Sequence, residues 1–166
     1  MAEPMIDATI AGKSANCYVA AAFADAYFAD TLEAREWLSF SPEDRARALI
    51  SATRKLDEEL AYFGAPYDTV TPQALKFPRD DDIDAQGQLQ IPDGIEYATC
   101  ELALHLLRQQ QVGDLLDRER LQQEGVRRVS VDGLTEEYRA GVWDGFPRRV
   151  KKLLRSFIDA GGRTVA

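Results

Sequence analysis

The chain has 166 residues, 45% of them hydrophobic, and a net charge of −8, a combination typical of one soluble globular domain. No segment provides the roughly 20 consecutive apolar residues that a membrane-spanning helix needs. The first residues lack the basic and apolar regions of a signal peptide. We therefore expect a single domain over residues 1–166 with no membrane partner.

Charge is distributed unevenly along the chain. From Phe146 onward there are six basic residues and one acidic residue, so this segment carries +5 and the other 145 residues carry −13. An acidic body stays soluble and repels DNA at long range. A basic segment suits an acidic protein partner or a phosphate backbone. The solvated face of a terminal helix explains the same charges without any partner.

Helical signals dominate the first part of the chain. Residues 1–16 predict an irregular N-terminal arm, and residues 18–36 are rich in alanine and have helical spacing. Ser41, followed by proline and two acidic residues, is a typical helix start. We expect that helix to run to about Tyr62 and to end before Gly64.

A long connection follows this helix. Residues 65–91 contain three prolines and an acidic cluster, and we expect them to form a long ordered loop. Loops of this length inside a compact domain are uncommon and are often functional. Pro92 opens the next helix, whose apolar stripe reaches about Gln111.

The last third of the chain mixes several signals. We expect a short helix at 115–123, a short strand or hairpin arm at 129–131 before an Asp-Gly turn, a basic C-terminal helix at 147–160 and a flexible end at 161–166. The predicted fold class is mostly α, a small helical bundle with a long ordered loop and, at most, one short β element.

The sequence contains no catalytic constellation. His105 is the only histidine, and it stands among leucines on a predicted helix, off the face of Cys100. The acidic cluster at 80–84 lacks the spacing of a calcium loop, because Gly87 is misplaced and no glutamate closes it. Cys17 and Cys100 are expected to be buried thiols. We therefore expect no enzyme activity, no cofactor and no metal site.

The aromatic residues do not form a pattern typical of single-stranded-DNA binding. Single-strand binders interleave aromatic rings with basic groups, so that bases stack while phosphates are neutralised. Here most aromatic residues fall in helical stripes beside acidic residues and alanines, as at Tyr27 and Phe28. This arrangement favours core packing over base stacking.

Several short stretches carry a family resemblance when they are taken together. The strongest is Gln-Ala-Leu-Lys-Phe-Pro-Arg at 73–79, followed by Asp84, Gly87 and Ile91-Pro92. The other stretches are 16–19, 24–28, Trp37, 48–50, 101–103, Tyr138, Pro147, Val150 and 153–154. In this order the chain resembles a family of small tailed-phage and prophage proteins, head–tail connectors or adaptors that are often labelled DnaT-like single-stranded-DNA-binding. The family usually has Trp at the position of Phe77, and residues 115–133 match poorly.

The resemblance implies a structural role. Such a connector docks beneath the portal protein at the head vertex, in a ring of about twelve copies. It joins the portal to a tail or head-closure protein in the neck of the virion, after assembly in the host cytoplasm. Double-stranded DNA passes through the ring without sequence readout. The alternative function is single-stranded-DNA binding, which predicts oligonucleotide affinity with strong salt dependence.

Two segments are the candidates for the partner interface. A stiff loop can reach a neighbour at low ordering cost, and a basic helix can meet an acidic portal surface. The residues predicted to contact a partner are Gln73, Phe77, Pro78, Arg79, Arg148, Arg149, Lys151, Lys152 and Arg155.

Overall fold

The computed structural model of the chain describes residues 4–67, 72–111, 128–131, 134–137 and 145–158. Within these residues the fold is mostly helical, as predicted, with five helices and one pair of short strands. In chain order the elements are α1 (Ala21–Ala29), α2 (Ala34–Ser39), α3 (Pro42–Glu59), α4 (Asp93–Gln111), β1 (Arg128–Val131), β2 (Leu134–Glu137) and α6 (Arg148–Leu154).

The helix expected at residues 18–36 is two helices, α1 and α2. The backbone N–H of Thr31 and its hydroxyl both donate to the carbonyl of Phe28, at 2.9 and 2.8 Å, which closes α1. Trp37 of α2 is 1% exposed, and its indole N–H donates to Asp25 of α1 at 2.7 Å. Alanine content favoured a continuous helix, but this capping and the burial of Trp37 fold α2 back onto α1.

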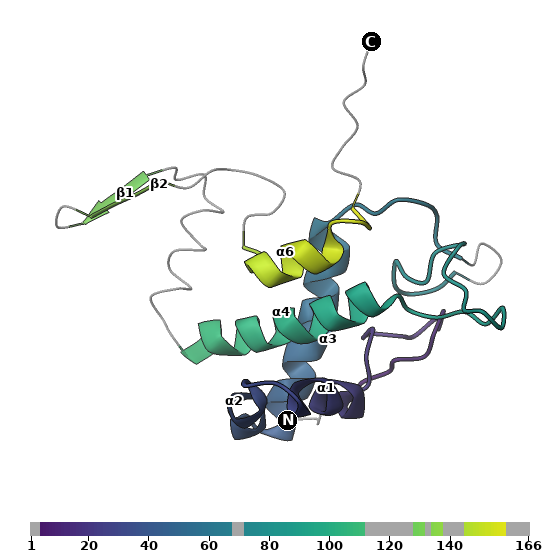
Figure 1. The fold of residues 1–166 in the computed structure, drawn as a ribbon, viewed down its shortest axis with the longest axis horizontal. Helices are drawn as coiled ribbons and strands as arrows, with labels where there is room; N and C mark the ends of the chain where they lie inside the picture. Colours follow the sequence, from purple (N-terminus) through teal and green to yellow (C-terminus); the bar gives the residue numbers. More distant parts are fainter. Residues whose placement is uncertain (1–3, 68–71, 112–127, 132–133, 138–144, 159–166) are drawn as a thin grey trace, which may run out of the picture.

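Helices α3 and α4 form the centre of the fold. Ser41 caps α3 as predicted, because its hydroxyl accepts the backbone N–H of Asp44 at 3.0 Å. Helix α4 packs against α3 and lies between α6 on one side and α1 on the other (Figure 1). The fully buried apolar side chains of these helices include Leu49, Leu56, Ile95, Leu102 and Leu104. In the described part of the chain, no helix is long and apolar enough to cross a membrane.

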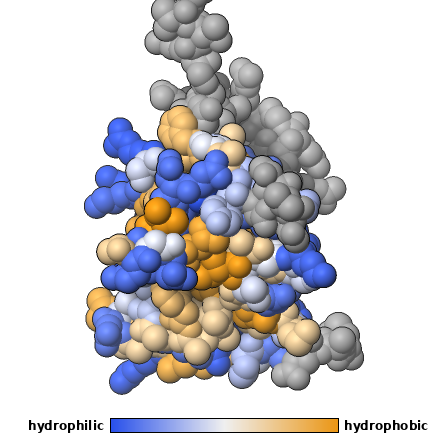
Figure 2. All heavy atoms as spheres, turned by 90° about the vertical axis from the view of Figure 1, so that its right-hand side faces the viewer, coloured by the Kyte–Doolittle hydropathy of each residue, from blue (hydrophilic) through white to orange (hydrophobic). Residues whose placement is uncertain are grey.

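The described part of the segment after α3 is a loop, as predicted. Its described residues, 65–67 and 72–91, form only two isolated bridges, between Pro66 and Arg79 and between Ile83 and Leu89. Figure 2 looks onto the side of the molecule where this loop lies and shows apolar surface at its centre with hydrophilic residues around it. The buried ring of Phe77 in this loop packs against the rings of Tyr18 and Tyr62.

The C-terminal third agrees only partly with expectation. Strands β1 and β2 pair antiparallel, which confirms a hairpin at this place. Helix α6 ends at Leu154 rather than at 160, and Ile158 then pairs with Tyr62 as an isolated bridge. Val150 and Leu154 are both fully buried, so one side of α6 packs on the body. The expectations for 115–123 and 161–166 lie outside the described residues.

Candidate functional site

Four cationic side chains form a stripe along α6 and its C-cap residue, Arg155. Arg148, Lys151, Lys152 and Arg155 stand at positions i, i+3, i+4 and i+7, which share one face of a helix with about 3.6 residues per turn. Arg148, Lys152 and Arg155 are exposed and Lys151 is half-buried, while the opposite positions hold the buried Val150 and Leu154. We call these four residues the basic stripe.

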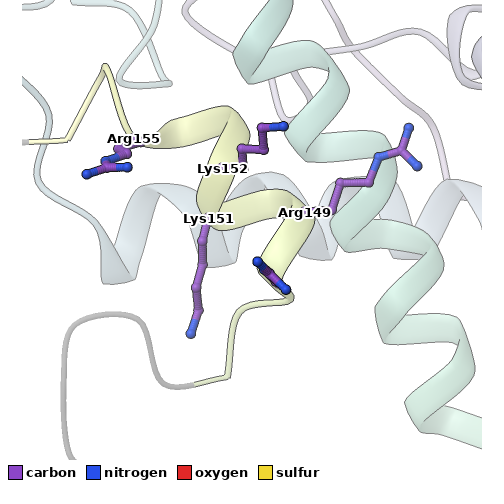
Figure 3. Close-up of a pocket in the computed structure, with 5 residues that line it drawn as sticks. Arg149, Lys151, Lys152 and Arg155 are labelled. Atoms are coloured by element: carbon purple, nitrogen blue, oxygen red, sulfur yellow. The ribbon is translucent and has the colours of Figure 1, made fainter.

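The basic stripe borders open space. A hollow of about 750 Å³ is lined, among the described residues, by the stripe and by Arg149. Figure 3 shows Lys151 and Arg155 pointing away from the body, whereas Arg149 reaches over the neighbouring helix. No ion pair joins a stripe residue to any other part of the described chain. The stripe can therefore offer its charge to an anionic surface.

Arg149, the fifth cation predicted for the interface, has internal partners. Its Nε lies 3.0 Å from Oε1 of Glu101 on α4, and its Nη2 donates to the hydroxyl of Tyr27 on α1 at 3.3 Å. The Tyr27 hydroxyl donates to the same Glu101 oxygen at 2.6 Å. We call these three residues the Arg149 clamp. Arg149 is itself exposed, with 56% of its side-chain surface accessible, so it differs from the other four cations in its internal partners and not in its burial.

The predicted loop residues lie mainly inside the molecule. Phe77 is 2% exposed and packs edge-on against the rings of Tyr18 and Tyr62, with centroids 5.9 and 4.7 Å away. Pro78 is also buried. The amide of Gln73 donates to the carbonyl of Pro78 at 3.0 Å, within the loop itself. In this conformation Phe77 and Pro78 have almost no surface to offer a partner.

Arg79 is also held by its own chain. Its guanidinium carbon lies 5.3 Å from the centroid of the Phe77 ring and 5.6 Å from that of Tyr62, which are cation–π contacts. Its Nη1 donates to the carbonyl of Gly64 at 3.3 Å, and its backbone N–H donates to Asp82 at 2.6 Å. Arg79 therefore links the start of the loop, beside Gly64, to its middle.

Asp57 on α3 anchors this loop, and sequence reasoning missed that role. The hydroxyl of Tyr18 donates to one carboxylate oxygen, and the backbone N–H of Lys76 donates to the other at 3.0 Å. Burial raises the pKa of Asp57, and these two hydrogen bonds oppose the rise. The sequence did contain a signal for this role. Asp57 falls on the same helical face as Thr53 and Leu60, which belong to the stripe that predicts the buried side of the helix.

The acidic cluster forms one wall of a groove. Asp80, Asp81 and Asp82 line a groove of about 440 Å³ together with the rings of Phe63 and Phe157. Phe63 is 57% exposed. The described residues contain no group of three or more side chains placed to hold a metal ion. The groove therefore combines an exposed ring with three carboxylates and with Arg79, whose guanidinium lies over the Phe77 ring.

The two predicted interface segments meet through apolar rings and not through their cations. The ring of Phe157, just beyond α6, lies 6.0 Å from that of Phe77 in the loop. The backbone N–H of Phe63 donates to the carbonyl of Phe157 at 3.0 Å. The loop is therefore part of the support on which the end of α6 rests.

Comparison with known protein families identifies a match. A family model described as "Putative DnaT-like ssDNA binding protein" matches residues 5–166. No curated protein and no solved structure matches the chain. The matched residues include every element described above, from the N-terminal arm to the basic stripe and the residues after it. Because the match covers nearly the whole sequence, the chain belongs to this DnaT-like family.

Proposed function

We propose that this protein is a structural, non-catalytic head–tail connector of a tailed phage, which docks through its basic stripe on an acidic surface of the portal protein. The proposal is supported by the connector-like stretches that recur in order along the sequence. It also rests on the four outward cations of α6, which suit a macromolecular surface of opposite charge. A ring of such copies under the portal would join the head to the tail or head-closure protein.

The placement of the aromatic rings favours a protein partner over a DNA strand. Base stacking needs exposed rings beside cations. Tyr27 is half-buried and stacks on Tyr97 at 5.1 Å, and Phe157 is half-buried against Phe77. Phe63 is exposed, but its groove is lined by three aspartates that would repel phosphate. Arg79 also lines this groove, but its guanidinium lies over the rings of Tyr62 and Phe77, and no residue of the basic stripe lines it.

The acidic body is consistent with a position around passing DNA. Outside the segment that begins at Phe146, the chain carries −13. A channel wall of this sign would let double-stranded DNA slide without sticking to it. In this proposal the protein belongs to the neck of the virion and is assembled in the host cytoplasm.

Single-stranded-DNA binding is the second candidate. The description of the family names this activity and favours it over the connector. The basic stripe would supply the phosphate contacts, and such binding weakens steeply with salt. The exposed ring of Phe63 would have to stack bases in spite of its aspartate neighbours.

One paired experiment separates the two functions. Purified protein is mixed with the portal ring encoded by the same genome and imaged by electron microscopy, and it is titrated in parallel with a labelled single-stranded dT oligonucleotide. The connector proposal expects extra ring-shaped density under the portal and weak oligonucleotide binding. Bare portal rings at micromolar protein, with tight and salt-sensitive oligonucleotide binding, would overturn it in favour of strand binding.

A further inference from the structure

Helix α6 needs tertiary contacts to hold its orientation. It has only seven residues, from Arg148 to Leu154, and helices of this length are unstable in isolation. Val150 and Leu154 bury one side of it against the body. Leu153 also packs against the core. Apolar contacts are non-directional, so they fix the position of a helix better than its rotation. A directional contact at the edge of the stripe would fix the rotation.

The Arg149 clamp supplies such a contact. Arg149 lies about 100° around the helix from Arg148, outside the arc of the basic stripe. Its guanidinium bonds to Glu101 on α4 and Tyr27 on α1, at 3.0 and 3.3 Å. The clamp therefore connects α6 to two other helices at a single point.

Glu101 depends on this contact. Its side chain is only 14% exposed, and a carboxylate in such a place needs a counter-charge or several donors. Arg149 supplies the charge, and Tyr27 donates a hydrogen bond at 2.6 Å. Burial, followed by the hydrogen bond to Glu101, raises the pKa of Tyr27, which therefore remains a donor. If Arg149 left to bind a partner, Glu101 would lose its ion pair.

We propose that Arg149 is a positioning residue and that the partner is contacted by the four cations of the basic stripe alone. The Arg149 clamp holds the rotation of α6 so that the stripe faces outward. This inference rests on the proposed use of α6 as a docking face. The occupant is the acidic portal surface of that proposal, and binding of a DNA strand in its place is an outcome of the test.

Matched variants separate positioning from contact. Arg149→Gln and Lys152→Gln each remove one positive charge from α6, and both are titrated against the dT oligonucleotide and the portal ring over a range of salt concentrations. Lys152→Gln should leave Tm unchanged and make the salt dependence shallower, by about 0.7 in log–log slope for the oligonucleotide. Arg149→Gln should lower Tm by about 3 °C or more. It should also weaken binding without changing that slope.

The opposite pattern would overturn the inference. If Arg149→Gln leaves Tm unchanged and flattens the salt dependence as Lys152→Gln does, Arg149 is a contact residue. If neither probe binds the wild-type protein, the proposed function fails. The positioning role of Arg149 is then tested without a partner, by a thermal double-mutant cycle of Arg149→Gln with Glu101→Gln. Coupled effects, with the double variant no less stable than the worse single variant, support the clamp. Independent, additive effects refute it.

Discussion

The loop at 73–79 and helix α6 were both predicted to contact a partner, but the structure uses their side chains differently. In the loop, Phe77 is buried, Arg79 lies over two rings of its own chain, and Gln73 bonds within the loop. In the basic stripe, Arg148, Lys152 and Arg155 are exposed and Lys151 is half-buried, and none of them forms an ion pair with another described residue. A distinctive sequence run can therefore mark a rigid internal connection, whereas helical spacing of charges marks the available surface.

The largest expected effect comes from Phe77. Phe77→Ala should lower the free energy of unfolding by about 3–5 kcal/mol, because it leaves a cavity between the rings of Tyr18, Tyr62 and Phe157. Urea denaturation followed by circular dichroism measures this loss. Phe63→Ala is the matched control, since that ring, just before the loop, is 57% exposed, and its cost should stay at about 0.5 kcal/mol. Equal costs would mean that Phe77 is not the internal anchor.

Asp57 should give the next largest effect. Asp57→Ala leaves the Tyr18 hydroxyl and the Lys76 backbone N–H without their acceptor, and should cost about 2–4 kcal/mol. Native-state hydrogen exchange should show faster exchange at Lys76. Glu58→Ala, at the exposed neighbouring position, serves as the control. Unchanged exchange at Lys76 would contradict the role of Asp57 as the anchor of the loop.

A smaller effect, dependent on pH, is expected at Glu96 on the helix that supports α6. Burial, with the charge of Asp93 nearby, raises the pKa of Glu96 to about 7. The folded state therefore holds more protons than the unfolded state between about pH 4.5 and 7, and stability falls as pH rises through this window. Because the group is half-exposed, we expect the loss to be only about 1 kcal/mol.

Glu96→Gln removes this ionisation. Its Tm should exceed that of the wild-type protein at pH 8, and the difference should disappear near pH 4.5, as followed by thermal melts in a pH series. A constant difference at every pH would show that the substitution acts through packing rather than through charge.

The smallest effect on stability is expected in the basic stripe. Lys152→Glu should change the free energy of unfolding by no more than about 0.5 kcal/mol, because the side chain is exposed. The same substitution should weaken partner binding measurably. A stability loss as large as that of Phe77→Ala would mean that the side chain of Lys152 is as important to packing as the buried ring of Phe77.

Much of the helical framework was predictable from local signals. The caps and apolar periodicity placed α3 and α4, and the Asp-Gly signal placed the hairpin, because these features act within a few residues. The split between α1 and α2 was not predictable in this way. It depends on Thr31 closing one helix and on Trp37 being buried against Asp25, which is a tertiary contact.

The candidate site was predictable only in part. The five cations of α6 were identified from charge, and the i, i+3, i+4, i+7 spacing already separates four of them from Arg149. The partners of Arg149, Glu101 and Tyr27, lie 48 and 122 residues away in sequence, so no local pattern pairs them. Burial of Phe77 was equally hidden, because an aromatic residue before a proline suits a surface loop as well as an interior one.

The most direct test of the account is a titration of the portal ring with two triple charge reversals. One variant replaces Arg148, Lys152 and Arg155 with glutamate, and its control replaces the equally exposed Lys13, Arg35 and Arg54, so that both change the net charge equally. The account predicts that only the stripe variant loses affinity, by about tenfold or more. Equal loss in both variants, or unchanged binding by the stripe variant, would contradict docking through α6.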